Sequence, residues 1–150
     1  MSPGQATAAL QERFAEEILE THAFRGDETV VVRPDRILDI LRFLRDEPSL
    51  SYDFLTDLCG VHYPEKEYLF EVVYHLYSFA HNRRLRVKAR LGEDGRITSV
   101  TSLMPAANWL EREAYDMVGI HFEGHPDLRR ILMPDGFEGH PLRRDYPLTG

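Results

Sequence analysis

The sequence predicts an α+β domain in which N-terminal helices pack on a small, mainly antiparallel sheet, followed by a later helix and an extended C-terminal arm. Three observations predict this fold. Apolar residues recur at helical spacing in several segments, two neighbouring segments alternate like strands, and the last thirty residues combine many glycines and prolines with many apolar side chains. A chain of 150 residues that is 43% apolar can build one hydrophobic core.

The first elements follow from these patterns. A helix is expected over residues 5–21, because Leu10, Phe14, Ile18 and Leu19 recur at the spacing of one apolar stripe. A short strand is expected at residues 29–32, where every side chain is β-branched.

A second helix is expected to begin at Pro34 and to end near Pro48. Proline suits the first turn of a helix, and the apolar side chains that follow share one face: Ile37, Leu38, Leu41 and Leu44. Residues 49–62 fit a strand or a short helix equally well.

A β-hairpin is the clearest pattern in the chain. Residues 68–79 and 84–91 alternate with period two, and a two-residue loop at His81-Asn82 would join them. The face predicted to point into the core carries Tyr74, Leu76, Ser78, Leu85, Val87 and Ala89. The face predicted to point outward carries Arg84, Arg86, Lys88 and Arg90 beside His75, Tyr77 and Phe79, with Glu71 further along.

This basic and aromatic face has two interpretations. It could be a platform for single-stranded nucleic acid, since cations beside stacking rings are typical of such surfaces. Alternatively, the cationic stems lie over half-buried aromatic rings and meet solvent or an acidic partner. The net charge of −7 favours the second interpretation and disfavours attraction of the whole domain to nucleic acid or anionic lipid.

The segment after the hairpin predicts a turn at residues 92–95, a weaker third strand within 96–103, and a helix over 106–118. Pro105 suits the first turn of this helix, and Gly119 can adopt the left-handed conformation that ends it.

Residues 120–150 are interpreted as an extended docking arm, and residues 1–119 as the core domain. The arm has too many glycines and prolines for a long helix or a central strand, but more apolar side chains than a solvated tail keeps. It also contains an internal repeat, FEGHPDLRR at 122–130 and FEGHPLRR at 137–144, which resembles two uses of one turn and anchor.

Several kinds of site are excluded or disfavoured. Cys59 is the only cysteine, which excludes an intrachain disulfide, a zinc site with two thiolates and a cysteine-ligated iron–sulfur cluster. Its apolar surroundings, FLTDLCGV, predict a buried and inert thiol. A metal site is not expected either, because the candidate ligands lack the spacing of a known site: His121, His125, His140, Asp127 and Asp145. Neither a secretory signal nor a membrane-spanning segment is recognised, so a cytosolic or peripheral location is expected.

Charged residues on the 106–118 helix allow two further interpretations. Glu111, Arg112, Glu113 and Asp116 could supply an acid–base pair, since Arg112 and Asp116 lie four residues apart. The favoured alternative is that these groups form ion pairs which fix the helix against a neighbouring element.

The segments AANWLEREAYDMVGIHFEGHPDLRRILMPDGFEGHPLRRDYPL, residues 106–148, and FEVVYHLYSFAHNRRLRVKARL, residues 70–91, resemble the 30 kDa subunit family of respiratory complex I, the bacterial NADH:quinone oxidoreductase. The resemblance implies a non-catalytic structural subunit of the peripheral, hydrophilic arm, on the cytoplasmic side of the inner membrane. It implies packing against the large quinone-site subunit and its cluster-bearing neighbour. NADH, FMN, the iron–sulfur clusters and quinone would belong to partner subunits.

The family motif falls on seventeen positions, none of which the resemblance assigns to catalysis: Glu111, Arg112, Glu113, Asp116, Gly119, His125, Pro126, Arg129, Arg130, Gly139, His140, Pro141, Leu142, Arg143, Asp145, Tyr146 and Pro147. His62 departs from the aspartate expected there. Because the chain ends two residues after Leu148, a separate polypeptide is expected rather than a form fused to the quinone-site subunit. The alternatives are the equivalent subunit of a membrane-bound hydrogenase or another ion-pumping oxidoreductase, a small acid–base enzyme, and an RNA-binding module.

Overall fold

The computed structural model describes residues 4–25, 27–64, 68–126, 128, 139 and 140. Their helices and strands follow one another in the order α1 (Gln5–Arg13), β1 (Ile18–Phe24), β2 (Asp27–Val32), α2 (Ile37–Asp46), β3 (Phe54–His62), β4 (Phe70–Ser78), β5 (Arg83–Leu91), β6 (Arg96–Thr98), α3 (Ala107–Val118) and β7 (His121–Glu123). Short 3-10 turns precede β1 and α2, at Ala15–Glu17 and Pro34–Arg36.

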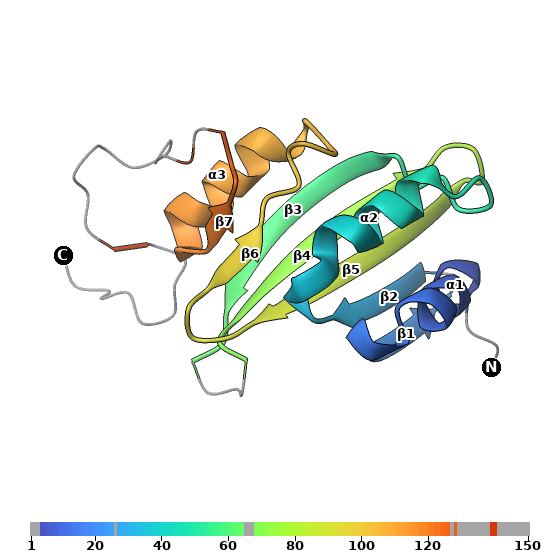
Figure 1. Ribbon diagram of the computed structural model, residues 1–150, viewed down its shortest axis with the longest axis horizontal. Coiled ribbons are helices and arrows are strands. Elements are labelled where there is room, and N and C mark those ends of the chain that lie inside the picture. Colours follow the sequence, from blue (N-terminus) through green and yellow to red (C-terminus); the bar gives the residue numbers. More distant parts are fainter. Residues whose placement is uncertain (1–3, 26, 65–67, 127, 129–138, 141–150) are drawn as a thin grey trace.

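A five-stranded sheet with the order β1-β2-β5-β4-β3 organises the molecule (Figure 1). Only the β2–β5 pairing within this sheet is parallel, and the other pairings are antiparallel. The helices cover one face, where the buried core includes Val30, Val32, Ile37, Ile40, Leu41, Leu44, Leu76, Leu85 and Val87. The predicted α+β class, with a mainly antiparallel sheet and a later helix, is confirmed.

The first predicted helix is half right. Helix α1 ends at Arg13, and residues 18–24 form strand β1 at the edge of the sheet. Phe14 leaves the helical conformation and packs against Phe43 of α2, with ring centroids 5.9 Å apart. Pairing of β1 with β2 replaces the local helical preference, because intrinsic propensity is a weak term that tertiary pairing overrides.

The hairpin forms with the predicted faces but with a different register. The loop contains four residues, 79–82, so that Ser78 pairs with Arg83 and Leu76 with Leu85. Asn82 supplies the left-handed conformation in this loop, with φ +52°. The register differs by two residues from that of a two-residue loop, and an even shift leaves every side chain on the same face.

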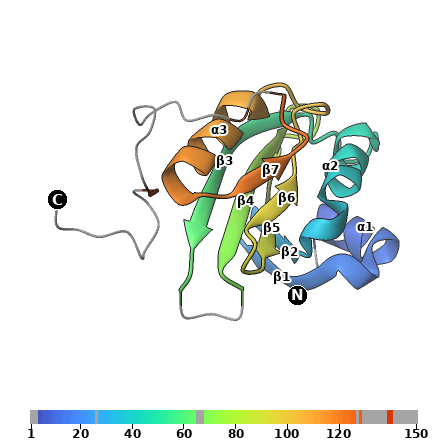
Figure 2. The ribbon, with the colours of Figure 1, turned by 60° about the vertical axis from the view of Figure 1, so that its left-hand side comes forward.

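Strands β6 and β7 form a second, two-stranded parallel sheet between α2 and α3 (Figures 1 and 2). The strand expected within residues 96–103 is therefore shorter than predicted and does not extend the hairpin. Its partner β7 carries Phe122, which is buried beside Ile97. Ile120, just before β7, is buried as well. The expected boundary at residue 119 thus assigns two core side chains to the arm.

Helix α3 packs on β3 at Gly60, because glycine leaves room for it there. A Cβ at Gly60 would lie 2.6 Å from Cδ1 of Ile120 and 3.6 Å from the Cβ atoms of Ala114 and Val118. The ambiguous segment 49–62 becomes strand β3 and so forms the platform for α3.

The prediction that Cys59 is buried is wrong. Leu58 takes the core position in β3, and the next residue, Cys59, faces the uncovered side of the sheet beside Val73. Partial desolvation and then the carboxylates of Asp57 and Glu71 raise the pKa of its thiol. The apolar run around Cys59 reflects alternation along a strand with one covered face rather than complete burial.

Candidate partner interface

Helix α3 carries most of the described family-motif residues and presents two different faces. Ala107, Ala114 and Val118 are buried against the sheet, whereas Trp109 is 51% exposed. The guanidinium of Arg112 lies over the Trp109 ring, 5.6 Å from its centroid. The outer face of α3 therefore displays an aromatic and cationic pair of the kind that dominates the energetics of many protein interfaces.

Glu111 fixes α3 to the loop that follows β6. Its carboxyl group is fully buried and accepts hydrogen bonds from Ser99 Oγ at 2.6 Å and from the Val100 backbone N–H at 2.8 Å. Burial raises the pKa of Glu111 to about 7, against the lowering effect of these two hydrogen bonds. The buried hydroxyl of Tyr74 lies close enough that Glu111 contributes to raising the pKa of Tyr74. Glu111 thus has a structural role and does not face solvent or substrate.

The predicted ion pair between Arg112 and Asp116 is not formed. Arg112 turns toward Trp109, and its Nε atom is buried without a hydrogen-bond partner among the described residues. Asp116 is fully buried on the inner side of the helix. Helix α3 is fixed to its neighbour through Glu111 by hydrogen bonds, so the expectation of fixation is met by a different residue and a different interaction.

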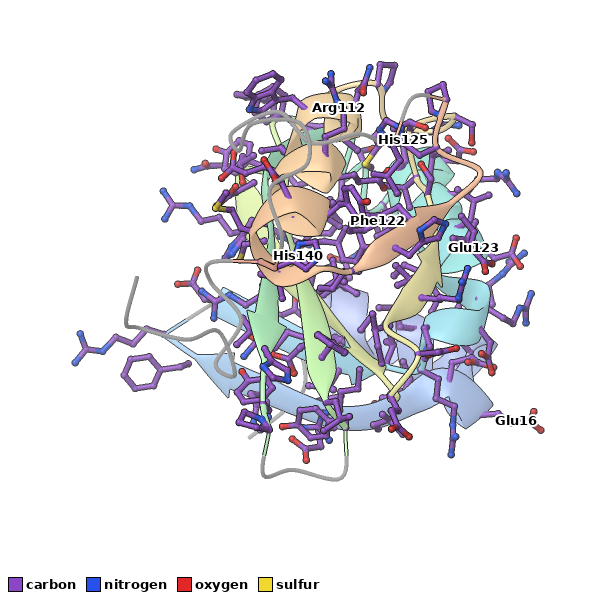
Figure 3. The ribbon with its side chains drawn as sticks, turned by 90° about the vertical axis from the view of Figure 1, so that its left-hand side faces the viewer. Glu16, Arg112, Phe122, Glu123, His125 and His140 are labelled. Carbon is purple, nitrogen blue, oxygen red and sulfur yellow. The ribbon has the colours of Figure 1, made fainter. Side chains whose placement is uncertain are left out.

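The histidines of the internal repeat contact α3 toward its two ends (Figure 3). A ring nitrogen of His125, Nε2, donates to the carbonyl of Asn108 at 3.1 Å, and Nδ1 of His140 donates to the carbonyl of Asp116 at 2.8 Å. The carbonyl of Asp116 lies in the last turn, where helical carbonyls lack partners within the helix. The histidines therefore bond backbone distant in sequence rather than local backbone, and they hold the chain after β7 against α3.

The glycines before these histidines share one backbone conformation. Gly124 has φ +84° and Gly139 has φ +85°, in the left-handed region that favours glycine. The repeat therefore uses the same turn twice, each followed by a histidine that contacts α3.

Gly119 is required at the end of α3 for two reasons. It adopts φ +88° and donates its N–H to the carbonyl of Tyr115 at 2.9 Å, which ends the helix as predicted. A Cβ at this position would also lie 2.9 Å from Cδ2 of the His140 ring. The absence of a side chain at Gly119 thus lets His140 approach the helix.

The remaining motif positions are divided between exposed and undescribed residues. Glu113 and Pro126 are exposed, and Pro126 lines a small groove with Asn108 and Gly124. Eight predicted positions lie outside the described residues: Arg129, Arg130, Pro141, Leu142, Arg143, Asp145, Tyr146 and Pro147. The predicted motif omits Trp109 and Ser99; the exposed tryptophan had a signal in the sequence, as the only tryptophan of the chain, whereas nothing marked the serine.

Among the residues that the structure describes, no three histidine, cysteine or acidic side chains are grouped so that they could hold a metal ion. Of the metal candidates considered in the sequence, Asp127 and Asp145 lie outside those residues. His121 instead packs its ring near Tyr115, with centroids 6.5 Å apart. No described helix is long and apolar enough to cross a membrane.

Comparison with known proteins defines the class of this chain. The family model described as "Respiratory-chain NADH dehydrogenase, 30 Kd subunit" matches residues 30–150. An NADH-quinone oxidoreductase subunit of this class from Rhizobium etli is 48% identical over 151 residues, covering 100% of this chain and 80% of the relative. The corresponding NADH-quinone oxidoreductase subunit from Roseiflexus castenholzii is 54% identical over 142 residues, covering 94% of this chain and 82% of the relative.

Solved structures share the fold. A trypsin-resistant fragment of Nqo5 matches with a TM-score of 0.70 at 32% identity, covering 81% of this chain and 98% of the fragment. A chain of an archaeal membrane-bound sulfane sulfur reductase matches with a TM-score of 0.78 at 26% identity, covering 95% of this chain and 84% of that one. The protein belongs to the family of the 30 kDa subunit of the respiratory-chain NADH dehydrogenase.

Proposed function

We propose that this chain is a non-catalytic structural subunit of the peripheral arm of a proton-translocating NADH:quinone oxidoreductase. The observation that carries the proposal is the family relationship, which extends over most of the chain at about half identity to subunits of that enzyme. In this proposal the chain lies on the cytoplasmic side of the inner membrane. It packs against the large quinone-site subunit and its cluster-bearing neighbour, which hold the cofactors.

The described part of the motif supports a role in assembly rather than catalysis. Glu111, the carboxyl group with the clearly raised pKa, is fully buried and occupied by Ser99 and Val100. A general acid or base must reach the proton that it transfers. By contrast, Trp109 and Arg112 lie on the outer face of α3, where a partner protein can bury them.

The C-terminal arm is proposed to continue this interface. In the described part, β7 and His140 hold the beginning and a later point of the arm against the core. Arginine side chains of the arm at 129, 130, 143 and 144 suit a partner surface, because a guanidinium pairs bidentately with carboxylates and stacks on aromatic rings.

The equivalent subunit of another ion-pumping complex is the second candidate, and the likeness to the archaeal sulfane sulfur reductase is the observation that favours it. That likeness comes with 26% identity, against about 50% to relatives named for NADH and quinone. The closer sequence agreement favours NADH as the electron donor.

Replacement of the chain by Trp109→Ala or Arg112→Ala variants tests the proposal. Since truncation of a desolvated aromatic or arginine anchor typically costs about 2 kcal/mol or more, retention of the variant protein in the purified complex should fall at least about tenfold. NADH-dependent quinone reduction should fall in parallel. The matched control is Arg42→Ala, which removes an exposed arginine from α2. Normal assembly and turnover in both α3 variants would contradict the proposed interface.

A further inference from the structure

The face of the five-stranded sheet opposite the helices carries an exposed aromatic cluster at one end. Phe54 of β3 is 48% exposed, and Phe79, at the start of the β4–β5 loop, is 68% exposed. Their rings meet edge to face at 5.4 Å, and the Phe79 ring also meets Tyr77 at 4.7 Å. Clustered exposed aromatic rings are uncommon on a protein surface that remains in water, and they indicate contact with another molecule.

Cationic side chains extend from this cluster along β5. Arg84 lies opposite Tyr77, Arg86 opposite His75, and Lys88 opposite Val73. Within the described residues, none of these three cations forms an ion pair. Arg90 differs from them, since it contacts Glu20 at 3.2 Å and stacks over Tyr68 at 4.2 Å.

The pKa of His75 reports the positive potential along this row. Desolvation lowers the pKa of His75 first, and the charges of Arg86 and Lys88 lower it further. The imidazole therefore stays neutral at neutral pH and adds no charge to the row.

A groove of about 460 Å³ joins the aromatic cluster to the cations. Phe54, Tyr77 and Phe79 line one part of it, and Arg84 and Arg86 line another. The groove thus combines rings that can bury an apolar anchor with two unpaired guanidinium groups that can each take a carboxylate.

We propose that this open sheet face is a second docking surface, and that it binds an acidic segment of a partner protein with an apolar anchor between its carboxylates. Charge complementarity selects this occupant. The chain carries 25 acidic against 18 basic residues, so three unpaired cations beside exposed rings form a local exception to an acidic surface.

Other occupants fit this face less well. Asp27 lines the same groove and Asp57 lies across from His75, where either carboxylate would repel a nucleic-acid phosphate. The rings contact one another edge to face, which occupies surfaces that stacked bases would use. A second copy of a chain with net charge −7 meets overall repulsion.

The surface is separate from the interface on α3. Gly60, whose missing Cβ accommodates α3, lies on the helix-covered face of the sheet, whereas the cationic row lies on the reverse. Variants of one surface therefore leave the other intact, and each can fail alone.

Zero-length crosslinking in the assembled complex tests the proposal. Carbodiimide joins an amine directly to a carboxylate, so the double variant R84K/R86K supplies three amines on this face together with Lys88. Mass spectrometry should find these lysines joined to aspartate or glutamate of another subunit. The control R42K places a new amine on α2 and should give at least tenfold fewer such products.

Thiol labelling measures how far the face is covered. In a Cys59→Ser background, the thiol introduced by Phe79→Cys should react with N-ethylmaleimide at least tenfold more slowly in the complex than in the isolated full chain. The thiol introduced by Arg42→Cys should react equally in both. Unchanged labelling at position 79 together with absent crosslinks would overturn the proposal. Crosslinks only between two copies of this chain, or protection at position 79 that nuclease treatment of the complex removes, would overturn it in favour of self-association or nucleic acid.

Discussion

At the scale of single residues, Glu111 shows how a carboxyl group can serve a fold without serving a reaction. The group is fully buried, and two hydrogen bonds from the loop after β6 compensate only part of its desolvation. The result is a pKa raised to about 7. This combination makes the attachment of α3 to that loop dependent on pH.

The first prediction is that ionisation of Glu111 destabilises the domain as pH rises. The pKa is about 7 in the folded chain and near 4.5 in the unfolded chain, so between these values only the folded state keeps the proton. The free energy of unfolding should therefore fall between pH 4.5 and 7, by up to about 3 kcal/mol. Urea denaturation at pH 5 and pH 8 measures this change.

Glu111→Gln should remove that dependence, because an amide can donate to Ser99 Oγ and accept from the Val100 N–H without ionising. The variant should match the natural chain at pH 5 and exceed its stability at pH 8. Glu113→Gln, at an exposed position of the same helix, is the control and should change neither value. An unaltered pH dependence in Glu111→Gln would show that another group is responsible.

At the scale of elements, the sequence predicts structure best where the pattern and the pairing agree. Helices α2 and α3 and the faces of the β4–β5 hairpin follow from periodicity, because each buries one face against a single neighbour. Strand β1 was missed because its conformation depends on pairing with β2, which a helical spacing of apolar residues conceals. The hairpin register depends on the loop conformation at Asn82, which the alternation of side chains does not contain.

The contacts of α3 could be predicted only in part. The glycine that ends the helix and the repeated Gly-His-Pro turns have sequence signals, and the structure finds Gly119, Gly124 and Gly139 in left-handed conformations. The partners of the histidines lie 17 and 24 residues away, and the partners of Glu111 lie in a loop without regular pattern. Such pairings depend on the three-dimensional packing of α3 on β3, which no local spacing encodes.

The second prediction concerns the clamp at the end of α3. Gly119→Ala should destabilise the chain more than Gly124→Ala, by about 1 kcal/mol or more. Both variants place alanine at a positive φ, but only at position 119 would the new Cβ meet the His140 ring. Denaturant unfolding of the full chain measures both.

A double-mutant cycle with His140→Ala separates the two causes. Removing the ring should recover the excess cost of Gly119→Ala and leave the cost of Gly124→Ala unchanged. Equal effects of the two alanine substitutions would mean that His140 does not pack against Gly119 in solution.

At the scale of the whole molecule, the division into core and arm decides which part of the chain can act alone. Ile120 and Phe122 are buried in the core, and β7 pairs with β6, so the self-sufficient unit includes residues beyond Gly119. The Nqo5 relative exists as a trypsin-resistant fragment that aligns with 81% of this chain. A chain cut after β7 should resemble such a fragment.

The last prediction is that truncation after Pro126 leaves a folded domain that cannot join the complex. The truncated chain keeps Ile120, Phe122 and the His125 contact and loses the His140 hydrogen bond, so its stability should fall by only about 1 kcal/mol from that bond. Truncation after Gly119 is the matched comparison, because it removes two fully buried side chains worth about 1.5–3 kcal/mol each and should unfold most of the protein. Denaturant unfolding and circular dichroism separate the two truncations, and affinity purification with NADH-dependent quinone reduction tests assembly. A chain ending at Pro126 that still assembled and supported normal turnover would show that the arm is not the docking element, because the folded core alone would then carry every contact that the complex requires.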